Sequence, residues 1–271
     1  MSDAVVSVRG VHKAFGAGAD RTEALAAIDL EVPKGSFVSL IGPSGCGKST
    51  LLRLIGDLTQ PSAGTVEVNG KTPHRARLDR DYGIVFQSPV LYEWRTVIEN
   101  VRLPLELAGR TKAEWEERSR TLLSLVGLEE FRDHYPWQLS GGMQQRVSIA
   151  RALALNPSIL LMDEPFGALD EMTRERLNQE LLQVCAETAA TALFVTHSIA
   201  EAVFLSTRIV VMSPRPGCIE RVVAVDLPRP RAAKTRALPR FFELVTEVRQ
   251  SLREDPGLAG DPPRPGGPGP R

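Results

Sequence analysis

The sequence lacks any apolar run long enough to cross a bilayer. A membrane-spanning helix needs ~18 to 20 mostly apolar residues in a row, and no stretch of the 271 residues approaches that length. Residues 1–6 also lack the basic region and apolar core of a secretion signal. We therefore expect a soluble protein that cannot itself conduct a solute across a membrane.

Cysteine is scarce, and there is no excess of charge of either sign. Cys46, Cys185 and Cys218 are too few and too scattered for a disulfide framework or for metal-ligand spacing, which favours a reducing compartment. Lys plus Arg number 33 and Asp plus Glu number 33, so the formal net charge is zero. This balance argues against a protein held to nucleic acid by a basic field, and we expect no nucleic-acid partner.

What is present is an ordinary globular composition in an alternating pattern. Hydrophobic residues make up 42% and charged residues 24%, enough for a large core in one domain, with or without a subdomain. Short apolar runs alternate with helical patterns, which predicts an α/β fold with a mostly parallel sheet. The predicted strands are 37–41, 159–162, 192–195 and 209–212. Helices are predicted over 50–55, within 94–156 and over 241–252, and the Pro/Gly-rich residues 255–271 are predicted to be disordered.

A phosphate-binding loop follows the first of these strands. The motif G-x-x-x-x-G-K-[ST] is formed by Gly42, Pro43, Ser44, Gly45, Cys46, Gly47, Lys48 and Ser49, with Thr50 starting the helical run. Its glycines let backbone N–H groups and the positive end of the following helix converge on phosphates. Lys48 would reach the β- and γ-phosphates, and the Ser49 hydroxyl would ligate Mg²⁺.

The loop alone does not separate ATPases, GTPases and kinases. No Asn in the chain is followed by the Lys-x-Asp pattern that binds guanine in GTPases. Adenine is therefore the better expectation, and the expected cofactors are ATP and Mg²⁺.

Two acids end the second predicted strand. Asp163 and Glu164 follow residues 159–162, and ligands of open parallel sheets bind beyond the carboxyl ends of the strands, so both acids should face the phosphate loop. Asp163 is suited to the Mg²⁺ shell, and Glu164 is suited to polarise an attacking water. The alternative is a solvated turn, because acids commonly follow strands.

A segment before the second strand resembles the signature motif of ATP-binding cassette (ABC) ATPases: Leu139-Ser140-Gly141-Gly142-Met143-Gln144-Gln145-Arg146. Further motifs of the family appear in order. Gln87 resembles the Q-loop glutamine, residues 168–170 resemble the D-loop, and His197 resembles the switch histidine.

The resemblance covers residues 5–227 and implies a P-loop NTPase fold with a mostly parallel sheet and an N-terminal antiparallel β subdomain. It also implies a helical subdomain inserted at about 88–157. On this basis we expect an ABC ATPase domain over 1–227, an extension with an amphipathic helix over 228–254, and a disordered tail over 255–271.

The signature segment also makes physical sense by itself. Ser140 is a good N-cap for a helix running to Leu155, and two glycines let the backbone approach a ligand. Such a helix terminus is a second anion site, unless the serine simply caps an ordinary helix. The resemblance implies a head-to-tail dimer in which each ATP lies between one chain's phosphate loop and the partner's signature. The further nucleotide-binding residues are then Leu139, Ser140, Gly141, Gly142, Gln144 and Asp170.

The resemblance assigns roles to three more side chains. His197 would sense the γ-phosphate, although a lone histidine is more often structural. Gln87 would contact Mg²⁺ or water and couple the nucleotide to the helical insertion. Phe15 occupies the adenine-stacking position, where tyrosine is frequent, and the alternative is a core aromatic. The expected catalytic set is Glu164, His197, Gln87 and Lys48.

Two segments are similar to the nitrate, sulfonate and taurine importer branch of the family, namely residues 213–217 and 226–231. Relatives there also carry pyrimidines or other vitamin precursors. Transport would need separate membrane permease subunits docking on the helical insertion, where residues 89–97 are apolar and aromatic, unless this segment is local core packing. A solute-binding protein would deliver the cargo, and the chain would sit peripherally on the cytoplasmic face of the inner membrane.

Other functions stay open but are less favoured. The segment between Gln87 and Ser140 is too short for the long coiled coils of DNA-repair relatives, and the single cassette is unlike ribosome-acting relatives. A non-hydrolytic nucleotide binder would not need every expected catalytic residue type, and an exporter subunit would not ordinarily carry residues 213–217. The helix over 241–252 could bind a partner, but packing on its own chain is favoured.

Overall fold

Residues 3–167 and 169–253 are described by a computed structural model of this chain. The predicted disordered tail over 255–271 and Ala168 of the D-loop segment lie outside the described residues. Among residues 3–167 and 169–253, no helix is both long enough and apolar enough to cross a membrane.

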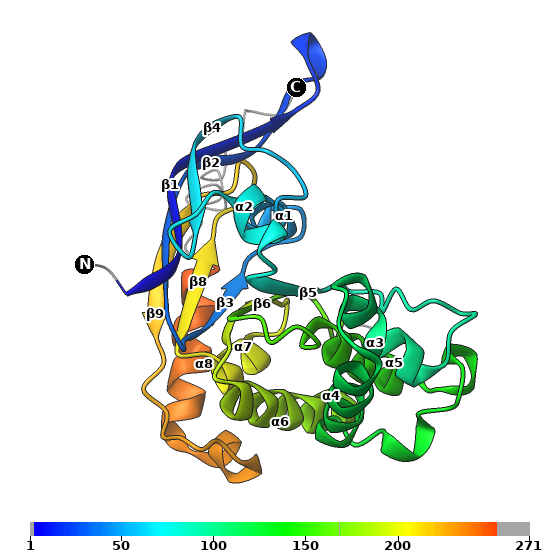
Figure 1. The fold of residues 1–271 in the computed structure, drawn as a ribbon. Coiled ribbons are helices and arrows are strands. Elements are labelled where there is room, and N and C mark those ends of the chain that lie inside the picture. Colours follow the sequence, from blue (N-terminus) through cyan, green and yellow to red (C-terminus); the bar gives the residue numbers. More distant parts are fainter. Residues whose placement is uncertain (1–2, 168, 254–271) are drawn as a thin grey trace, which may run out of the picture.

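A six-stranded sheet forms the centre of the fold (Figure 1). Its strands are β3 (Phe37–Ile41), β5 (Tyr82–Val85), β6 (Ile159–Asp163), β7 (Thr191–Val195), β8 (Arg208–Met212) and β9 (Ile219–Ala224). Their order in the sheet is β5-β6-β7-β3-β8-β9, with the first five parallel and β9 antiparallel to β8. The four predicted strands and the mostly parallel sheet are confirmed.

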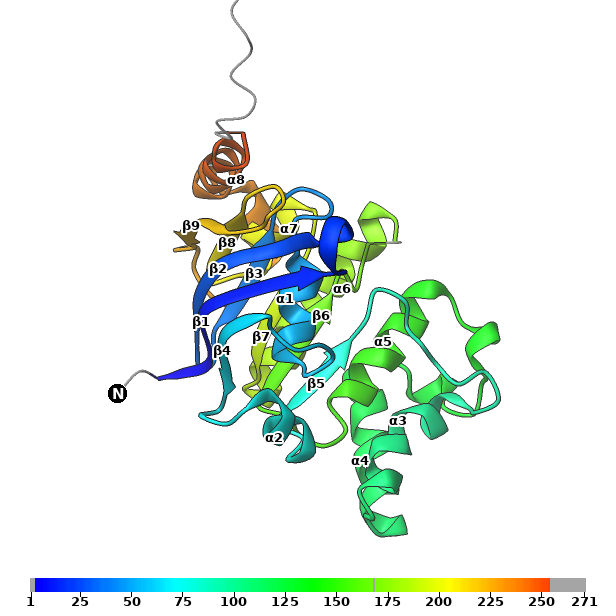
Figure 2. The ribbon, with the colours of Figure 1, turned by 90° about the horizontal axis from the view of Figure 1, so that it is seen from above.

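A smaller antiparallel sheet lies beside it. Its order is β2-β1-β4, formed by β1 (Ala4–Phe15), β2 (Thr22–Pro33) and β4 (Ala63–Val68), with the short helix η1 (Gly18–Asp20) joining the first two. Helix α1 (Lys48–Ile55) lies between the sheets, touching β2 and β4 on one side and β6 and β7 on the other (Figure 2). Helix α2 (Pro73–Leu78) packs on β4. The expected antiparallel β subdomain is confirmed.

Three helices cover the other face of the large sheet: α6 (Glu171–Thr188), α7 (Ile199–Leu205) and α8 (Pro239–Ser251), the last preceded by η4 (Ala233–Ala237). The amphipathic helix predicted over 241–252 is α8. It buries Phe241, Leu244 and Val248 and contacts α7 and β9, so it packs on its own chain as favoured from the sequence.

The four inner strands of the large sheet, β6, β7, β3 and β8, are buried on both faces because a layer lies on either side of them. Along β6, Leu160 and Met162 join the apolar cluster with α6, α7 and α8, while Ile159 and Leu161 join the cluster with α1 and the antiparallel sheet. Alternate side chains of a strand point to opposite faces, so the two pairs of side chains face different layers. Both pairs are apolar because both faces are covered. A continuous apolar run is therefore the expected signature of such a strand.

Helices α3 (Val97–Leu107), α4 (Lys112–Leu125) and α5 (Gly141–Ala152) form a lobe beside β5, with short turns η2 (Glu129–Phe131) and η3 (Pro136–Gln138) between the last two (Figure 2). Thr96 and Thr111 cap α3 and α4, each with a reciprocating glutamate at the third helical position. The predicted helical insertion is confirmed.

The predicted end of α5 at Leu155 is wrong by three residues. The helix stops at Ala152, and the chain then turns through Asn156, which has a φ of +52°. Pro157 follows, and a residue before proline is disfavoured in the helical region. The helix therefore ends before the residue that precedes the proline.

Candidate functional site

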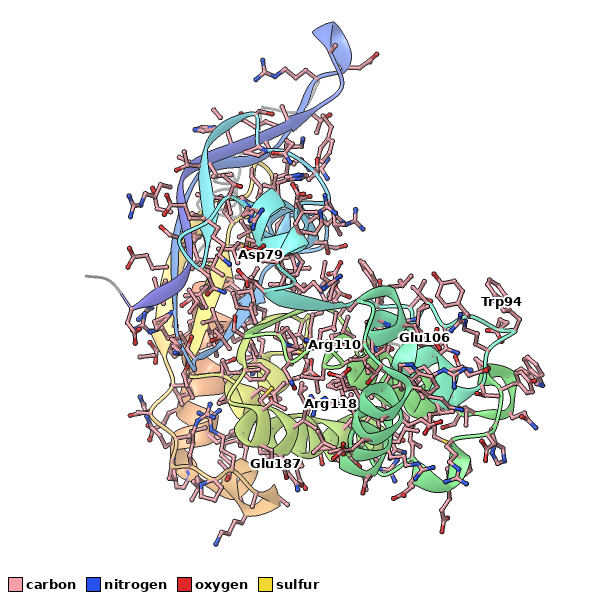
Figure 3. All side chains as sticks on the ribbon, viewed as in Figure 1. Asp79, Trp94, Glu106, Arg110, Arg118 and Glu187 are labelled. Atoms are coloured by element: carbon pink, nitrogen blue, oxygen red, sulfur yellow. The ribbon has the colours of Figure 1, made fainter. Side chains whose placement is uncertain are left out.

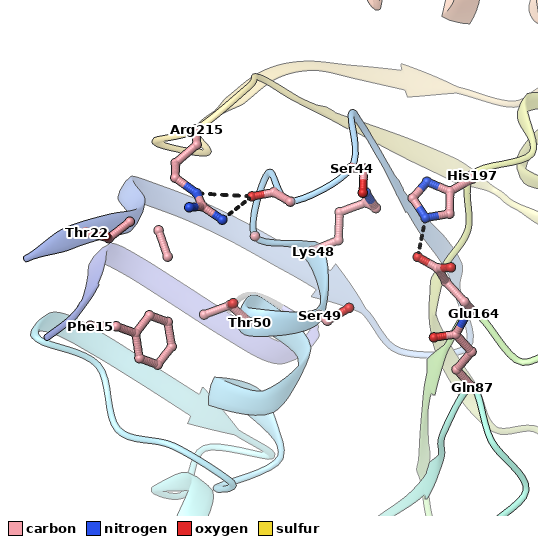
Figure 4. Close-up of a pocket in the computed structure, with 13 residues that line it drawn as sticks. Phe15, Thr22, Ser44, Lys48, Ser49, Thr50, Gln87, Glu164, His197 and Arg215 are labelled. Carbon is pink, nitrogen blue, oxygen red and sulfur yellow. Dashed lines mark hydrogen bonds and ion pairs between the residues drawn. The ribbon is translucent and has the colours of Figure 1, made fainter. Parts of the chain in front are cut away.

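Polar residues follow the carboxyl ends of all five parallel strands and meet around one pocket. The phosphate loop follows β3, Gln87 follows β5, Glu164 follows β6, His197 follows β7 and Arg215 follows β8. The pocket has a volume of about 590 Å³. It is lined by Phe15, Thr22, Ala24, Ser44, Gly45, Gly47, Lys48, Ser49, Thr50, Gln87, Glu164, His197 and Arg215 (Figure 4). This position agrees with the rule that open parallel sheets bind ligands beyond their carboxyl ends.

The phosphate loop bends so that the start of α1 faces the pocket. Gly47 has a φ of +103°, and a Cβ there would lie 2.5 Å from Leu25 Cδ2 and 2.9 Å from the Ala24 carbonyl oxygen. A side chain does not fit, so the first N–H groups of α1 have no capping side chain. These N–H groups and the positive helix end can bind an anion such as a phosphate.

Lys48 ties the loop together from within. Its Nζ donates to the carbonyl oxygens of Gly42 and Pro43, at 2.9 Å each, and lies 3.7 Å from Cys46 Sγ. Cys46 is only 1% exposed. Of the predicted loop residues, Gly42, Pro43 and Cys46 thus support the loop without lining the pocket, whereas the other five and Thr50 line it.

Ser49 and Asp163 meet where α1 approaches the end of β6. Ser49 Oγ donates to Asp163 Oδ1 at 2.6 Å, and Asp163 is 8% exposed. A hydroxyl and a carboxylate are hard oxygen donors of the kind that Mg²⁺ prefers, and Mg²⁺ is usually held by one or two carboxylates together with substrate phosphates. The residues present therefore fit the magnesium site expected from the sequence.

Glu164 and His197 pair at the end of the pocket opposite Phe15 (Figure 4). Glu164 Oε1 lies 2.6 Å from His197 Nε2. Glu164 has a φ of +47°, and its N–H donates to the Val195 carbonyl oxygen at 3.0 Å. Strained backbone of this kind is concentrated at functional sites, and here the bend aims the carboxylate at the histidine.

A buried acid holds the loop that carries His197. The Thr196 hydroxyl donates to Glu201 on α7, and the Ser198 N–H donates to Thr196 Oγ1 at 3.0 Å. Burial raises the pKa of the Glu201 carboxyl, although the Thr196 hydroxyl and the charges of Arg174 and Arg236 act in the other direction. The histidine is thus placed by a polar network behind the pocket.

Gln87 lies beside Glu164 and is held through the helical lobe. A Cβ built on Gly167 would lie 3.7 Å from both Gln87 Nε2 and Glu164 Oε2, so the amide and the carboxylate border the same space. The neighbouring Phe86 carbonyl oxygen accepts a hydrogen bond from Gln145 Nε2 on α5, at 3.2 Å. Gln145 was not predicted as a functional residue, yet it links the signature helix to the residue that precedes Gln87.

The signature residues lie apart from this pocket. Ser140 caps its own helix, accepting the Met143 N–H at 3.3 Å, and the Leu139 side chain is buried in the core. Gln144 Nε2 donates to the carbonyl oxygens of Pro136 and Leu139, at 2.9 and 3.4 Å. No residue of 139–144 belongs to the pocket lining given above, so one chain does not bring the two predicted anion sites together.

Asp170 likewise serves a helix end within its own chain. Its carboxylate accepts the Thr173 N–H at 3.0 Å and caps α6. This backbone hydrogen bond lowers the pKa of Asp170. The pocket lining does not include Asp170.

Phe15 lines the pocket at the end of β1 and is 47% exposed. The alternative interpretation of a core aromatic is therefore wrong. Lys13 Nζ lies 4.9 Å from the centre of its ring. An exposed aromatic face at the mouth of a phosphate-binding pocket can stack on a planar base.

Sequence reasoning missed three lining residues: Thr22, Ala24 and Arg215. The first two lie on β2, and only the packing of the antiparallel sheet brings them to the loop. Arg215 could have been predicted, because it follows the predicted strand at 209–212. Ligands of open parallel sheets bind beyond the carboxyl ends of the strands, so residues after this strand lie at the same edge of the sheet as Asp163 and Glu164.

Comparison with known proteins gives the same family as the motifs. The sequence pattern of the family described as "ABC transporter" matches residues 25–167. The chain is similar to the taurine import ATP-binding protein TauB of Rhizobium johnstonii, with 46% identity over 90% of this chain and 95% of that protein. It is also similar to the nitrate import ATP-binding protein NrtD of Synechocystis sp., with 43% identity over 85% of this chain and 88% of that protein.

A solved structure shares the fold. The chain resembles the dimeric ATP-binding cassette MJ0796 in a post-hydrolysis state bound to ADP and Pi. The TM-score is 0.72 with 39% sequence identity, covering 81% of this chain and 98% of the other.

Proposed function

This chain belongs to the ABC transporter family, and from that premise we propose that it is the ATP-hydrolysing subunit of an importer for small solutes. The observation that carries the proposal is the pocket at the strand ends, where Lys48, Ser49, Glu164, His197 and Gln87 meet. We place the ATPase domain at residues 1–227, with residues 228–254 as an extension that includes α8.

ATP would lie along the pocket with its adenine at Phe15 and its phosphates at the start of α1. The N–H groups of the loop and the Lys48 ammonium supply donors and positive charge for the phosphate chain. Ser44, Gly45 and Thr50 line the same stretch. This arrangement favours a nucleoside triphosphate over an uncharged ligand.

Ser49, Asp163 and Gln87 would hold Mg²⁺. When bound, the cation would neutralise negative charge on the phosphate oxygens. The hydrogen bond between Ser49 and Asp163 already brings two of these donors together.

Glu164 would act as the general base of hydrolysis. A water oxygen attacks the γ-phosphorus, its proton passes to the carboxylate, and the bond to the ADP oxygen breaks. His197, which lies 2.6 Å from Glu164, would donate to a γ-phosphate oxygen. Gln87 borders the same space and would orient the water.

A second copy of the chain would complete each site. Ser140 and the glycines after it form an anion-binding helix start that does not reach its own chain's pocket. In a head-to-tail dimer, this segment would cover the γ-phosphate bound by the partner. The dimeric MJ0796 structure supports this assembly.

The helical lobe would receive the membrane permease. Trp94 is 72% exposed and packs edge-on against Tyr92, and Trp137 is exposed and stacks on Tyr135 (Figure 3 shows Trp94 at the outer edge of the lobe). Local core packing does not account for so exposed a tryptophan. Exposed aromatic side chains gathered on one lobe favour a protein–protein interface.

The hydrogen bond from Gln145 to Phe86 offers a route from this surface to Gln87. Docking would hold the chain peripherally at the membrane, on its cytoplasmic face, where ATP is available. The taurine and nitrate functions of the relatives favour cargo of that kind, with pyrimidine-like vitamin precursors as the second candidate. A solute-binding protein would deliver the cargo to the permease.

The test uses Glu164→Gln in the full-length chain. The variant should bind ATP like the wild type and hydrolyse it at least ~10²-fold more slowly, because an amide cannot accept the proton. Fluorescent-analogue titration measures binding, and phosphate release measures turnover. Normal turnover in the variant would overturn the assignment of Glu164.

A further inference from the structure

The turn between β8 and β9 is fixed in shape by its own hydrogen bonds. Ser213 Oγ accepts the Cys218 N–H at 2.9 Å, and the Ser213 N–H donates to the Cys218 carbonyl oxygen at 3.0 Å. Pro214 and Pro216 restrict the backbone on either side of Arg215. Arg215 therefore projects from a rigid turn.

The same turn packs closely against β2 and the phosphate loop. The Gly217 N–H donates to the Ala24 carbonyl oxygen, and its own carbonyl oxygen accepts the Ala26 N–H, both at 3.0 Å. A Cβ on Gly217 would lie 1.9 Å from the Cys46 carbonyl oxygen, so no side chain fits there. The position of Arg215 relative to the loop is thus set by close backbone packing.

The Arg215 guanidinium is directed at the loop and is weakly held. Its Nε and Nη2 both donate to the single carbonyl oxygen of Gly45, at 3.4 and 3.2 Å (Figure 4). Arginine has five N–H donors. In the described part of the chain these are its two hydrogen bonds, and no aspartate or glutamate pairs with it. The side chain is exposed and lines the pocket.

We propose that Arg215 binds the phosphate chain of the nucleotide, as a second cation beside Lys48. The proposal rests on the proposed function, which places ATP in this pocket. A guanidinium–phosphate contact is charge-assisted and bidentate, so it is stronger than two long bonds to one carbonyl oxygen. Lys48 is buried and Arg215 is exposed, so the loop has one cation on its inner side and one on its outer side.

The contact specifies phosphate and not base. The guanidinium meets the loop at Gly45, whereas the aromatic face suited to a base belongs to Phe15. Arg215 should therefore favour ATP and ADP over a nucleoside. Its loss should weaken these ligands without changing adenosine binding.

The experiment measures displacement of a fluorescent ATP analogue from the full-length chain by ATP, ADP and adenosine. Arg215→Met keeps most of the side-chain length and removes every donor. We expect it to weaken ATP and ADP roughly tenfold, as loss of a charged hydrogen bond at a partly exposed site should, and to leave adenosine unchanged. Arg208→Met is the matched control, because it removes an exposed arginine at the other end of β8.

Arg215→Gln separates phosphate binding from support of the loop. Glutamine keeps an N–H donor for the Gly45 carbonyl oxygen but has no charge, so it should weaken ATP and ADP as Arg215→Met does. If Arg215→Met lowers the melting temperature without nucleotide, the affinities of Arg215→Gln for ATP and ADP decide whether the guanidinium binds phosphate. Wild-type affinity for ATP in both variants would overturn the proposal, as would equal weakening of adenosine.

The wild-type titration keeps the two proposals apart. If ATP fails to displace the analogue from the wild-type chain, the proposed function is wrong. If ATP binds the wild type and both Arg215 variants equally, only the role of Arg215 is wrong.

Discussion

Helices α1 and α5 both begin at a glycine-rich turn, yet their surroundings differ completely. At the start of α1, Ser49 hydrogen-bonds to Asp163 at the end of β6. Glu164, after β6, pairs with His197, after β7, and both line the same pocket. The start of α5 is bordered by side chains that are already engaged within the lobe, such as Gln144 and Leu139. One helix start borders the proposed reaction site, whereas the other is proposed to act only as an anion-binding terminus.

The difference teaches that a helix N-terminus attracts an anion but does not act on it. Catalysis needs convergent groups from several strands, and α1 has them because β3, β6 and β7 are neighbours in one sheet. Among residues 3–167 and 169–253, the start of α5 has no comparable group of catalytic side chains around it. In the proposed dimer it would contribute to chemistry only when a second molecule presents a bound phosphate.

The largest expected effect tests this division by complementation. Lys48→Ala and Ser140→Asp should each lose at least ~10²-fold in ATPase rate, the scale seen when one transition-state donor is removed. Aspartate is a good N-cap, so the second change keeps α5 and repels the γ-phosphate. Chains mixed in equal amounts should regain roughly a quarter of wild-type activity, because half of the dimers would hold one intact site.

The control for this mixture is each variant mixed with itself. A site assembled within one chain predicts no recovery in the mixture of the two variants. That result would remove the reason for treating α1 and α5 as halves of one site.

A smaller effect is expected at the adenine end of the pocket. Phe15→Ala should weaken ATP binding by the isolated chain roughly tenfold, since stacking of a base on an aromatic ring contributes ~1–3 kcal/mol. Phe15→Tyr should bind normally because it keeps the ring face. Ser140→Asp should keep the ATP affinity of the isolated chain within about twofold of the wild-type value. A loss as large as that of Phe15→Ala would show that the signature contributes to the pocket of its own chain, contrary to the proposed dimer.

The hydrogen bond from α5 to Phe86, the residue before Gln87, should matter for coupling to the permease more than for nucleotide binding. Gln145→Leu leaves the Phe86 carbonyl oxygen without its donor. One neutral hydrogen bond contributes ~0.5–1.5 kcal/mol, so permease-stimulated hydrolysis should fall a few-fold while ATP affinity stays unchanged. Reconstituted complexes measure the first quantity and titration measures the second; full stimulation would show that the contact is dispensable.

The smallest effect concerns the support of His197. Burial raises the pKa of Glu201 in the folded state above the unfolded value, so the associated stability is present below pH 4.5 and is lost as pH rises through the folded pKa. Glu201→Gln keeps an acceptor for the Thr196 hydroxyl and does not titrate.

The melting temperature of Glu201→Gln should therefore match the wild type near pH 4.5 and exceed it as the pH rises through the folded pKa of Glu201 toward pH 7.5. The other groups that face the carboxyl, Arg174, Asn178 and Arg236, are common to both proteins. A constant difference across this range would contradict the assigned pKa direction.

Four strands of the central sheet, β3, β6, β7 and β8, could be predicted from the sequence because burial on both faces makes them continuous apolar runs. The edge strands β5 and β9 were not predicted, because their side chains are only partly buried. The rule that open parallel sheets bind ligands beyond the carboxyl ends of their strands located Asp163 and Glu164 beside the loop. His197 was assigned by its resemblance to the switch histidine, and it lies next to Glu164. The resemblance of residues 139–146 to the signature motif indicated the family.

The remaining site residues depend on contacts that no local pattern encodes. Thr22 reaches the pocket through the packing of a separate sheet, and Gln145 acts through a hydrogen bond to a carbonyl 59 positions away. The exposure of Phe15 and Trp94 also follows from tertiary packing, because an aromatic side chain in a sequence fits a core as well as a surface.

The backbone at Glu164 has a consequence for how this chain can change. A left-handed φ is one that glycine adopts freely and that a residue with a Cβ adopts only at some cost. Glycine at this position would adopt the left-handed backbone at less cost, but it would lack the carboxylate that we propose as the general base. Backbone stability and the proposed chemistry therefore favour different residues at this single position.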